Sequence, residues 1–397
     1  MATYLIIIIY IAFICLGLPD SLLGSAWPAM SLELSAGLDT GGIISMVITI
    51  GTIISSLLSY KLINRFGTGN VTIFSVLLSA IALVGFSISP SFIWLIVFAI
   101  PLGLGGGSVD AALNNYVALN YKPHHMSWLH SFWGIGATVG PVVMGYFMKK
   151  NNNWRGGYLS VSMMLFMLIT LLFFTRFLWV KTSVSSTKTS SDEENTQEIA
   201  GNGSIFKVKG LNLSLLSCFF YCGAEMTAGL WGSSFLVYIK GLSPSTAASW
   251  ISLYYAGITV GRLLIGFVSM KISSKMLIRA GQLVALSGAI LLLLPFSSSL
   301  FSLTGLILIG LGCAPIYPSI LHETPNRFGQ ANSQRIMGLQ MASAYTGSTL
   351  LPPLAGFIAG KINLIVYPVM LLIYIVGMLI SSEWINIVLQ NKIKQST

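Results

Sequence analysis

The chain has 397 residues, of which 54% are hydrophobic and only 8% are charged. Soluble globular proteins carry about 25% charged residues, so this composition excludes a soluble domain and predicts an all-α integral membrane protein. The formal net charge of +10 would suit a nucleic-acid-binding protein if the chain were soluble. Here the basic residues follow a membrane topology, and we expect no nucleic-acid partner.

Apolar runs separated by polar breaks predict twelve membrane-spanning helices, each long enough to cross the hydrocarbon core. The predicted spans are 4–32, 42–63, 70–89, 92–119, 126–148, 157–179, 211–239, 246–270, 276–295, 301–323, 332–359 and 364–384. These runs are too long and too continuously apolar for the strands of a membrane β-barrel. The first run lacks a basic leading region and is too long for a cleaved signal, so it is interpreted as the first spanning helix.

The basic residues predict the orientation of the chain. When the loops are assigned alternately to the two sides of the membrane, fifteen Lys and Arg residues share the side of both termini and five lie opposite. The positive-inside rule then places both termini in the cytoplasm. An odd number of spans would spoil this separation. We therefore expect a multi-pass protein of the plasma or inner membrane.

One long polar stretch, 180–210, is rich in Ser, Thr and acidic residues and has no hydrophobic period. It predicts a flexible cytoplasmic linker between an N-terminal six-helix bundle (1–179) and a C-terminal six-helix bundle (211–397). The halves are similar, because GATVGPVVMGYFMKK (136–150) aligns without gaps with GSTLLPPLAGFIAGK (347–361), and GLGGG of the fourth span aligns with GLGCAP of the tenth. Two pseudo-symmetric bundles are typical of transporters that bind substrate between them near the midplane.

Seven ionisable residues lie inside the predicted spans. They are Asp20, Asp110, His130, Glu225, Arg262, His322 and Glu323. A charge there costs on the order of 3 kcal/mol, so such residues usually face a cavity or a partner. A carboxylate shielded from water takes up a proton more readily, which makes Asp20 and Asp110 candidates for proton coupling. A structural hydrogen bond to a neighbouring helix is the alternative. Pro19 and Gly17 beside Asp20 are candidate points of flexure.

Glu225 lies in YCGAEMTAGLWGSSF of the seventh span, with Tyr221 and Trp231 nearby. A carboxylate with aromatic rings suits a polyhydroxylated or cationic ligand, while packing against lipid or neighbouring helices is the alternative for the rings. His130 is a candidate for proton relay or substrate binding, or is a structural histidine. Arg262 needs a counter-ion such as Glu225 or an acid of the tenth span, and we expect a structural or gating pair.

His322 and Glu323 lie near the cytoplasmic end of the tenth span, which favours a gate or a solvated rim over substrate contact. All four cysteines fall inside predicted helices and are interpreted as buried small hydrophobes. We predict no disulfide, no metal site and no cofactor. No nucleophile–base arrangement is visible, so no catalytic residue is assigned and an enzyme is disfavoured.

Six short motifs resemble a known family. They are DSLL (20–23), DAALNNYV (110–117), HSFWGIGA (130–137), YCGAE (221–225), GRLLIG (261–266) and YPSIL (317–321). Together they cover spans in both halves, and the chain resembles the major facilitator superfamily, within it the fucose:proton symporter (fucose permease-like) family. The resemblance implies that Asp20 and Asp110 occupy the family's two membrane carboxylates, implicated in proton coupling and sugar binding, and that Asn114 lines the cavity.

Three positions depart from the fucose carriers. Asp110 stands where they typically have Glu, Trp133 replaces a polar residue that contacts sugar, and Glu225 replaces a neutral amide. The signature loop after the second span keeps Arg65 and Gly67 but lacks the usual aspartate. These differences argue against fucose itself as the solute.

We therefore predict a monomeric secondary active transporter that moves a small polar solute, a sugar, in symport with protons by alternating access. Asp20 and Asp110 would couple protons, with sodium as the alternative ion. The predicted substrate-binding residues are Asn114, Asn115, His130, Trp133, Tyr221, Glu225 and Trp231. The alternative functions are a proton-driven exporter of drugs or amphiphilic compounds, and a sensor or scaffold that binds ligand without flux.

Overall fold

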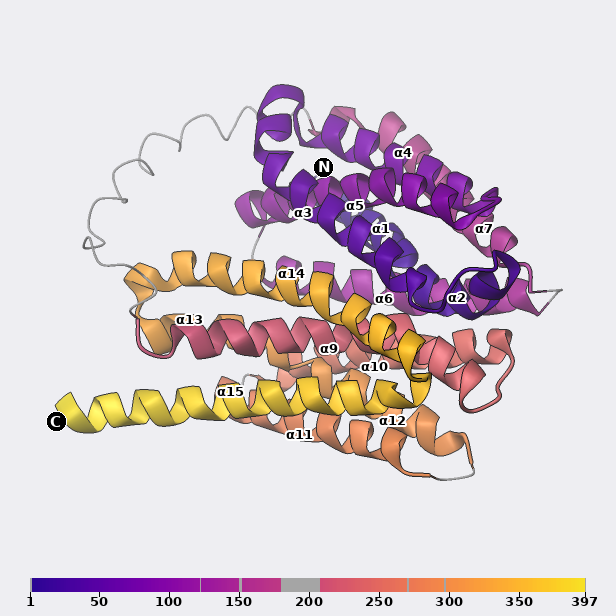
Figure 1. The fold of residues 1–397 in the computed structure, drawn as a ribbon. Coiled ribbons are helices and arrows are strands. Elements are labelled where there is room, and N and C mark those ends of the chain that lie inside the picture. The colour runs from indigo at the N-terminus through magenta and orange to yellow at the C-terminus, as the bar shows by residue number, and fades with distance from the viewer. Residues whose placement is uncertain are drawn as a thin grey trace.

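The computed structural model describes residues 2–121, 123–149, 152–179, 208–269, 271–295 and 298–396, and the regular elements in these ranges are helices. Figure 1 shows them in two groups. The first group is α1 (Ala2–Asp20), α2 (Leu22–Glu33), α3 (Thr40–Phe66), α4 (Thr68–Ser87), α5 (Phe92–Asn120), α6 (Pro123–Met148) and α7 (Trp154–Phe174). The second group is α9 (Leu211–Tyr238), α10 (Pro244–Val268), α11 (Ser274–Leu293), α12 (Leu300–Cys313), α13 (Ile316–Phe328), α14 (Gln330–Lys361), the 3-10 helix η3 (Leu364–Val366) and α15 (Tyr367–Ser396).

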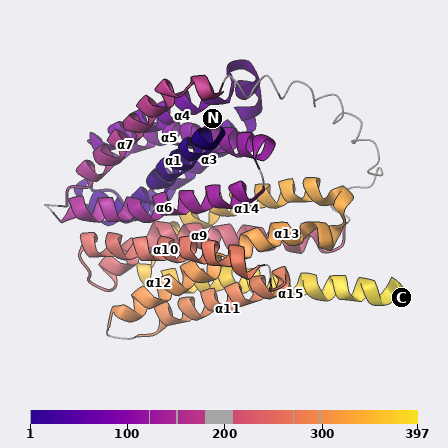
Figure 2. The same cartoon turned by 180° about the vertical axis from the view of Figure 1, so that it is seen from behind.

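Ten helical segments in the described ranges are long and apolar enough to cross a membrane, which confirms an all-helical, multi-pass membrane protein. The predicted spans 126–148 and 332–359 also form helices, α6 and α14, but neither is among the ten. Both lie where the two groups meet (Figures 1 and 2), since α6 packs on α10 and α14 packs on α3. The side of α6 and of α14 that contacts the other group does not face lipid. These two helices therefore need fewer apolar residues than a helix surrounded by lipid. The count of twelve spans stays a prediction, as does the division of the chain at 180–210, most of which lies outside the described residues.

Two of the membrane segments are interrupted helices. The first predicted span is divided at Ser21 into α1 and α2, and Pro19 beside the break has no N–H to donate to the helix. The tenth predicted span is divided into α12 and α13 by Ala314 and Pro315. Interrupted helices expose backbone groups, which transporters use at binding sites.

Matching glycine contacts occur in the two groups. A Cβ added to Gly136 of α6 would overlap the carbonyl oxygen of Ile14 in α1, and one added to Gly347 of α14 would overlap that of Phe219 in α9. Gly136 and Gly347 are the first residues of the two aligned sequence stretches. Backbones approach this closely only where a helix presents a glycine. The shared contact supports an internal repeat.

A second pair of contacts follows the same pattern. A Cβ on Gly103 of α5 would overlap the carbonyl oxygen of Ile48, and one on Gly310 of α12 would overlap that of Tyr254. These glycines begin the aligned GLGGG and GLGCAP stretches. Two independent helix pairs therefore agree with the alignment made from sequence.

Replacing Gly136 by Ala should destabilise the protein, because its Cβ would meet backbone that cannot rotate away. Overpacking of this kind costs about 1–3 kcal/mol, and we expect a lower melting temperature in detergent. Gly106→Ala is the matched control, since nothing lies within 4 Å of its added Cβ. An unchanged melting temperature for Gly136→Ala would contradict the close packing of α1 and α6.

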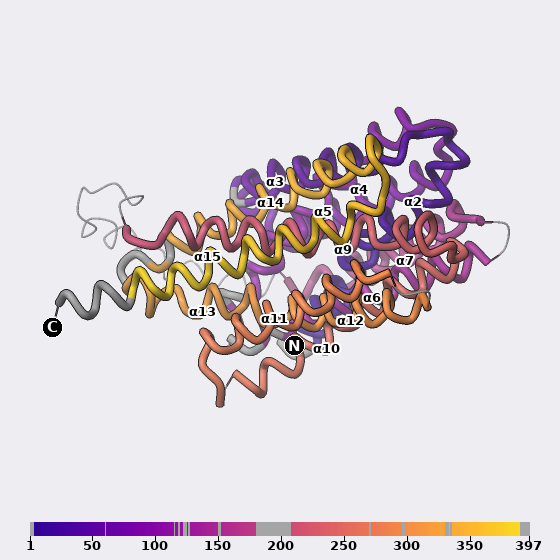
Figure 3. The backbone as a smooth tube through the Cα atoms, turned by 60° about the horizontal axis from the view of Figure 1, so that its bottom comes forward, coloured from indigo at the N-terminus to yellow at the C-terminus, as the bar shows by residue number. Residues whose placement is uncertain are grey.

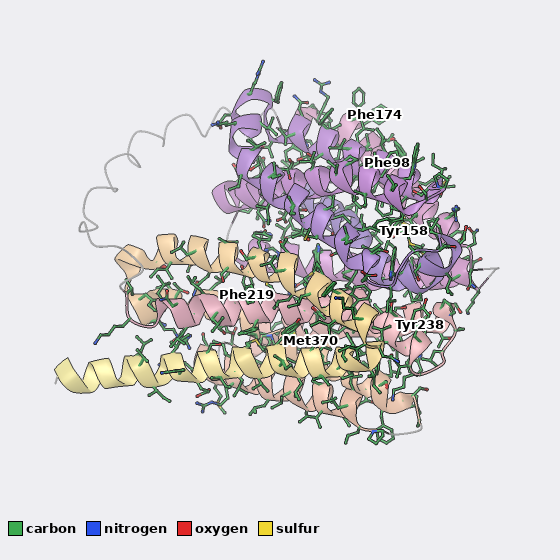
Figure 4. The ribbon with its side chains drawn as sticks, viewed as in Figure 1. Phe98, Tyr158, Phe174, Phe219, Tyr238 and Met370 are labelled. Atoms are coloured by element: carbon green, nitrogen blue, oxygen red, sulfur yellow. The ribbon has the colours of Figure 1, made fainter. Side chains whose placement is uncertain are left out.

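The two groups meet firmly where α2 crosses α9, which we call the closed end. A Cβ on Gly24 would overlap the carbonyl oxygen of Gly229. The Ser233 hydroxyl donates to the carbonyl of Ser25 at 3.3 Å, and the Tyr238 hydroxyl donates to that of Pro28 at 3.1 Å. Figure 3 shows α14 beside α3, another close contact between the groups, and Figure 4 labels Tyr238 at the closed end.

Candidate functional site

Asp20 lies in the middle of the first membrane segment, at the last residue of α1, and its side chain is exposed. The indole N–H of Trp133 on α6 donates to its Oδ2 at 2.8 Å. Gly17 allows this approach, because a Cβ there would overlap the carbonyl oxygen of Trp133. The exposed carboxylate of Asp20 thus accepts its hydrogen bond from a neutral donor.

Asp110 and Asn114 form a local pair on α5. The Asn114 side-chain amide donates to Oδ1 of Asp110 at 2.9 Å and to its backbone carbonyl at 3.0 Å. The four-residue spacing puts both side chains on one helix face, and both are half-buried. Asp110 is close enough to Asp20 to interact electrostatically. The side chain of Asn115 lies outside the described residues.

Glu225 on α9 is paired with Arg262 on α10. A guanidinium nitrogen lies 3.1 Å from Oε1 of Glu225, and only 16% of the Arg262 side chain and 13% of the Glu225 side chain are exposed. The Tyr254 hydroxyl donates to the backbone carbonyl of Glu225 at 2.8 Å. Of the acidic partners that the sequence offered for Arg262, Glu225 is the one that forms the ion pair. Whether the pair acts as a gate stays a prediction.

Arg262 also reaches the first group. Its guanidinium lies 5.6 Å from the ring centroid of Trp133, within cation–π range. Asp20, Trp133, Arg262 and Glu225 therefore form a continuous row from α1 to α9, which we call the central row. Polar and charged groups from both halves of the chain meet in this row.

His130 on α6 lies beside the central row. Its side chain is exposed and meets the ring of Phe13 edge-on at 6.1 Å between centroids. It also interacts electrostatically with Arg262. His130 is therefore a second titratable side chain close to Arg262.

Several tyrosines interact with the acidic residues of the site, and only Tyr221 was predicted from the sequence. Tyr221, which was predicted, is buried and stacks on Tyr317 with centroids 5.7 Å apart and planes 12° from parallel. Tyr255 interacts electrostatically with Asp20 and Glu225, and Tyr345 interacts with Asp110 and Asp20. The internal repeat could have indicated Tyr317 as a site residue. Tyr317 lies seven residues after Gly310, and Asp110 lies seven residues after the equivalent Gly103.

Three predicted residues lie away from the central row. Trp231 is buried near the closed end, where its indole N–H donates to the carbonyl of Pro352 at 2.8 Å. His322 is exposed, with Nδ1 3.1 Å from the Ser274 hydroxyl on α11. Glu323 is buried on α13 and accepts a long hydrogen bond of 3.5 Å from Asn326. The roles expected of these three residues stay predictions.

The sequence model of the Major Facilitator Superfamily matches residues 9–235 and 213–387. "Bypass of stop codon protein 6" of Saccharomyces cerevisiae is 26% identical over 409 residues, covering 94% of this chain and 80% of that protein. The glucose/mannose transporter GlcP of Bacillus subtilis is 26% identical over 356 residues, covering 88% of this chain and 86% of the transporter. Efflux pump DEP3 of Fusarium langsethiae is 30% identical over 102 residues, but this match covers 25% of this chain and 18% of the pump.

Solved structures show the same fold. The nucleoside transporter NupG superimposes with a TM-score of 0.76 at 12% identity, covering 96% of this chain and 98% of that one. A D-xylose-proton symporter gives a TM-score of 0.69 at 16% identity, covering 94% and 96%. The narrower resemblance to the fucose permease-like family is not confirmed by these comparisons. The family and the transporter relatives indicate a membrane transporter of small-molecule solutes and not an enzyme. Since the family match spans nearly the whole sequence, the chain belongs to the Major Facilitator Superfamily.

Proposed function

We propose that the protein is a secondary active transporter that carries a small polar solute, a sugar, together with protons by alternating access. One observation carries this proposal: Asp20 is an exposed carboxylate in mid-membrane whose hydrogen bond comes from the neutral indole of Trp133. No ion pair among the described side chains includes Asp20. A lone charge in mid-membrane is costly, and a proton can neutralise a carboxylate that has no cation paired with it.

The side chains around Asp20 suit a hydroxylated solute. Carboxylate oxygens accept hydrogen bonds from hydroxyl groups, the Asn114 amide can both donate and accept, and the ring of Trp133 offers a surface for the apolar side of a sugar ring. A relative that matches most of the chain is a glucose/mannose transporter. Glucose and mannose are therefore the first solutes to test.

The cycle follows from the closed end. With both termini in the cytoplasm, as the charge distribution predicts, the closed end faces outside and the space at Asp20 opens to the cytoplasm. Rocking of the two groups would then separate α2 from α9 and close the opposite end. Asp20 would take up its proton from outside while α2 and α9 are separated, and the neutral, loaded site would then open to the cytoplasm, so proton and solute would cross together.

Uptake into proteoliposomes tests the proposal directly. We expect an imposed pH gradient, acidic outside, to drive accumulation of radiolabelled glucose or mannose, and a protonophore to abolish it. Empty liposomes and a sodium gradient without a pH gradient are the controls. Accumulation driven by sodium alone would overturn the proton assignment, and flux of neither sugar would overturn the solute assignment.

A proton-driven exporter is the second candidate, favoured by the local similarity to an efflux pump. An exporter would move its compound against the direction of proton entry. Reversing the imposed gradient in the same vesicles separates the two candidates, because symport reverses the solute with the proton while antiport moves the two oppositely.

A further inference from the structure

Asp20 and Glu225 occupy equivalent positions in the two halves. Ile14 of α1 and Phe219 of α9 each receive the matching glycine contact described above. Six residues further along the chain stand Asp20 and Glu225, and ten residues further stand Gly24 and Gly229. Gly24 and Gly229 touch each other where α2 crosses α9. Each carboxylate therefore lies four residues before that crossing, one in each half.

Their partners are not equivalent. Asp20 accepts from the neutral Trp133, whereas Glu225 is paired with the cation Arg262. The repeat also shows which residue of the first half is equivalent to Arg262. Ile48 of α3 and Tyr254 of α10 receive the second matching glycine contact, and eight residues after them stand Ser56 and Arg262. Two equivalent carboxylates thus have one arginine between them, and it comes from the second half.

Arg262 contacts Glu225 directly and is connected to Asp20 through the ring of Trp133. Its guanidinium lies 3.1 Å from Glu225 and also over the ring of Trp133, whose N–H is bonded to Asp20. Its Nε is buried and has no hydrogen-bond partner among the described residues. The guanidinium also interacts with the Tyr221 side chain, and its Nε stays without a hydrogen-bond partner in the described part of the chain while Arg262 is paired with Glu225.

We propose that Asp20 and Glu225 compete for Arg262, and that the proton on Asp20 decides the outcome. With Asp20 protonated, Arg262 and Glu225 balance each other and the halves stay apart at the end opposite the closed end. With Asp20 ionised, two carboxylates face one cation, and Arg262 moves between them and draws α1 toward α9 and α10. The inference rests on the proposed proton coupling at Asp20. It assigns to Arg262 the role of linking protonation of Asp20 to the movement of the two halves.

Other titratable groups face the same row. Asp20 is faced by Asp110 on α5, Tyr255 on α10 and Tyr345 on α14. Arg262 is faced by His130 on α6, by Tyr221 and Cys222 on α9, and by Cys313 on α12. Of these, His130 and Asp110 could also give a pH response, so each needs its own variant in the test.

The test measures the opening itself and needs no solute. Spin labels are placed on the exposed residues Asn64 and Lys271, near the ends of α3 and α10 away from the closed end, after the four native cysteines are replaced by Ala. Distances between the labels are measured by pulsed electron paramagnetic resonance in mildly acidic and mildly alkaline buffer. We expect a shorter distance to gain population at alkaline pH.

The central variants change the two acids and the arginine. Asp20→Asn and Arg262→Gln should both remove the pH response. Glu225→Gln should give the shorter distance even in mildly acidic buffer, because an Arg262 without its partner favours the ionised form of Asp20 and is free to pair with it. A normal response in Arg262→Gln, or no shift in Glu225→Gln, would overturn the proposal.

Further variants separate the competing explanations. Arg279→Gln is the matched control and should respond as the labelled parent does, since Arg279 belongs to an ion pair with Glu383 elsewhere on the second half. His130→Gln and Asp110→Asn test the two other groups that could sense pH. If either of these variants abolishes the response while Asp20→Asn keeps it, the sensor is that group and the proposal is overturned.

Arg262→Gln could fail to fold, because it leaves the largely buried carboxylate of Glu225 without a counter-ion. The double variant Arg262→Gln with Glu225→Gln removes both charges and should also lose the pH response; a retained response there overturns the proposal as well. The outcomes also separate this inference from the transport proposal. If the pH response depends on Arg262 but no sugar is taken up, the proposed solute is wrong. If uptake is driven by protons but the pH response does not depend on Arg262, the proposed competition for Arg262 is wrong.

Discussion

Replacing Asp20 by Asn should abolish proton-driven accumulation of solute while leaving solute exchange largely intact. Asparagine keeps the size of the side chain and an oxygen that can accept from Trp133, so the local packing survives. It cannot bind or release a proton, so the site is permanently neutral and accumulation loses its link to the pH gradient. We expect at least about a tenfold loss of accumulation, which is equivalent to about 1.4 kcal/mol of lost coupling.

Two assays on the same proteoliposomes measure the effect. Uptake under an imposed pH gradient reports coupling, and counterflow of labelled against unlabelled solute without a gradient reports exchange. Asp39→Asn is the matched control, because Asp39 lies at the start of α3 near the closed end. Unaltered gradient-driven uptake in Asp20→Asn would refute the coupling role of Asp20.

The spacing of residues along a helix explains which side chains of one helix could be predicted to share a site. Tyr221 lies four residues before Glu225 and Asn114 lies four residues after Asp110, so each shares a face with its acid. Trp231 follows Glu225 by six residues, about 1.7 turns at 3.6 residues per turn, and so points to another side of α9. Its burial away from the central row follows from that rotation. Rotation about the helix axis, and not nearness in sequence, decides which side chains meet.

Contacts between helices were beyond the reach of the sequence. The bond between Trp133 and Asp20 depends on how tightly α1 and α6 pack at Gly17, and the sequence shows the glycine without its neighbour. Tyr255 and Tyr345 come to the carboxylates from other helices in the same way. The pair of Arg262 and Glu225 could be anticipated as one of two options, since a cation in a membrane needs an acid.

Replacing Gly24 by Val should slow transport about tenfold, because it keeps α2 and α9 from packing together at the closed end. The added Cβ would overlap the carbonyl oxygen of Gly229, so α2 and α9 must move apart, and the hydrogen bonds from Ser233 and Tyr238 to α2 would be lost with them. Overpacking of this kind costs about 1–3 kcal/mol, enough to shift the population away from the closed state by about tenfold. We expect flux to fall by a similar factor while the protein remains folded.

Labelling of an added cysteine measures this opening. In a background without native cysteines, Ser233→Cys is buried at the closed end and should resist a membrane-impermeant maleimide. Adding Gly24→Val should make it reactive from that side. Gly266→Val is the matched control, because nothing lies within 4 Å of its added Cβ on α10. If Gly24→Val transports normally and the cysteine stays protected, then the contact between Gly24 and Gly229 is not what seals this end of the molecule.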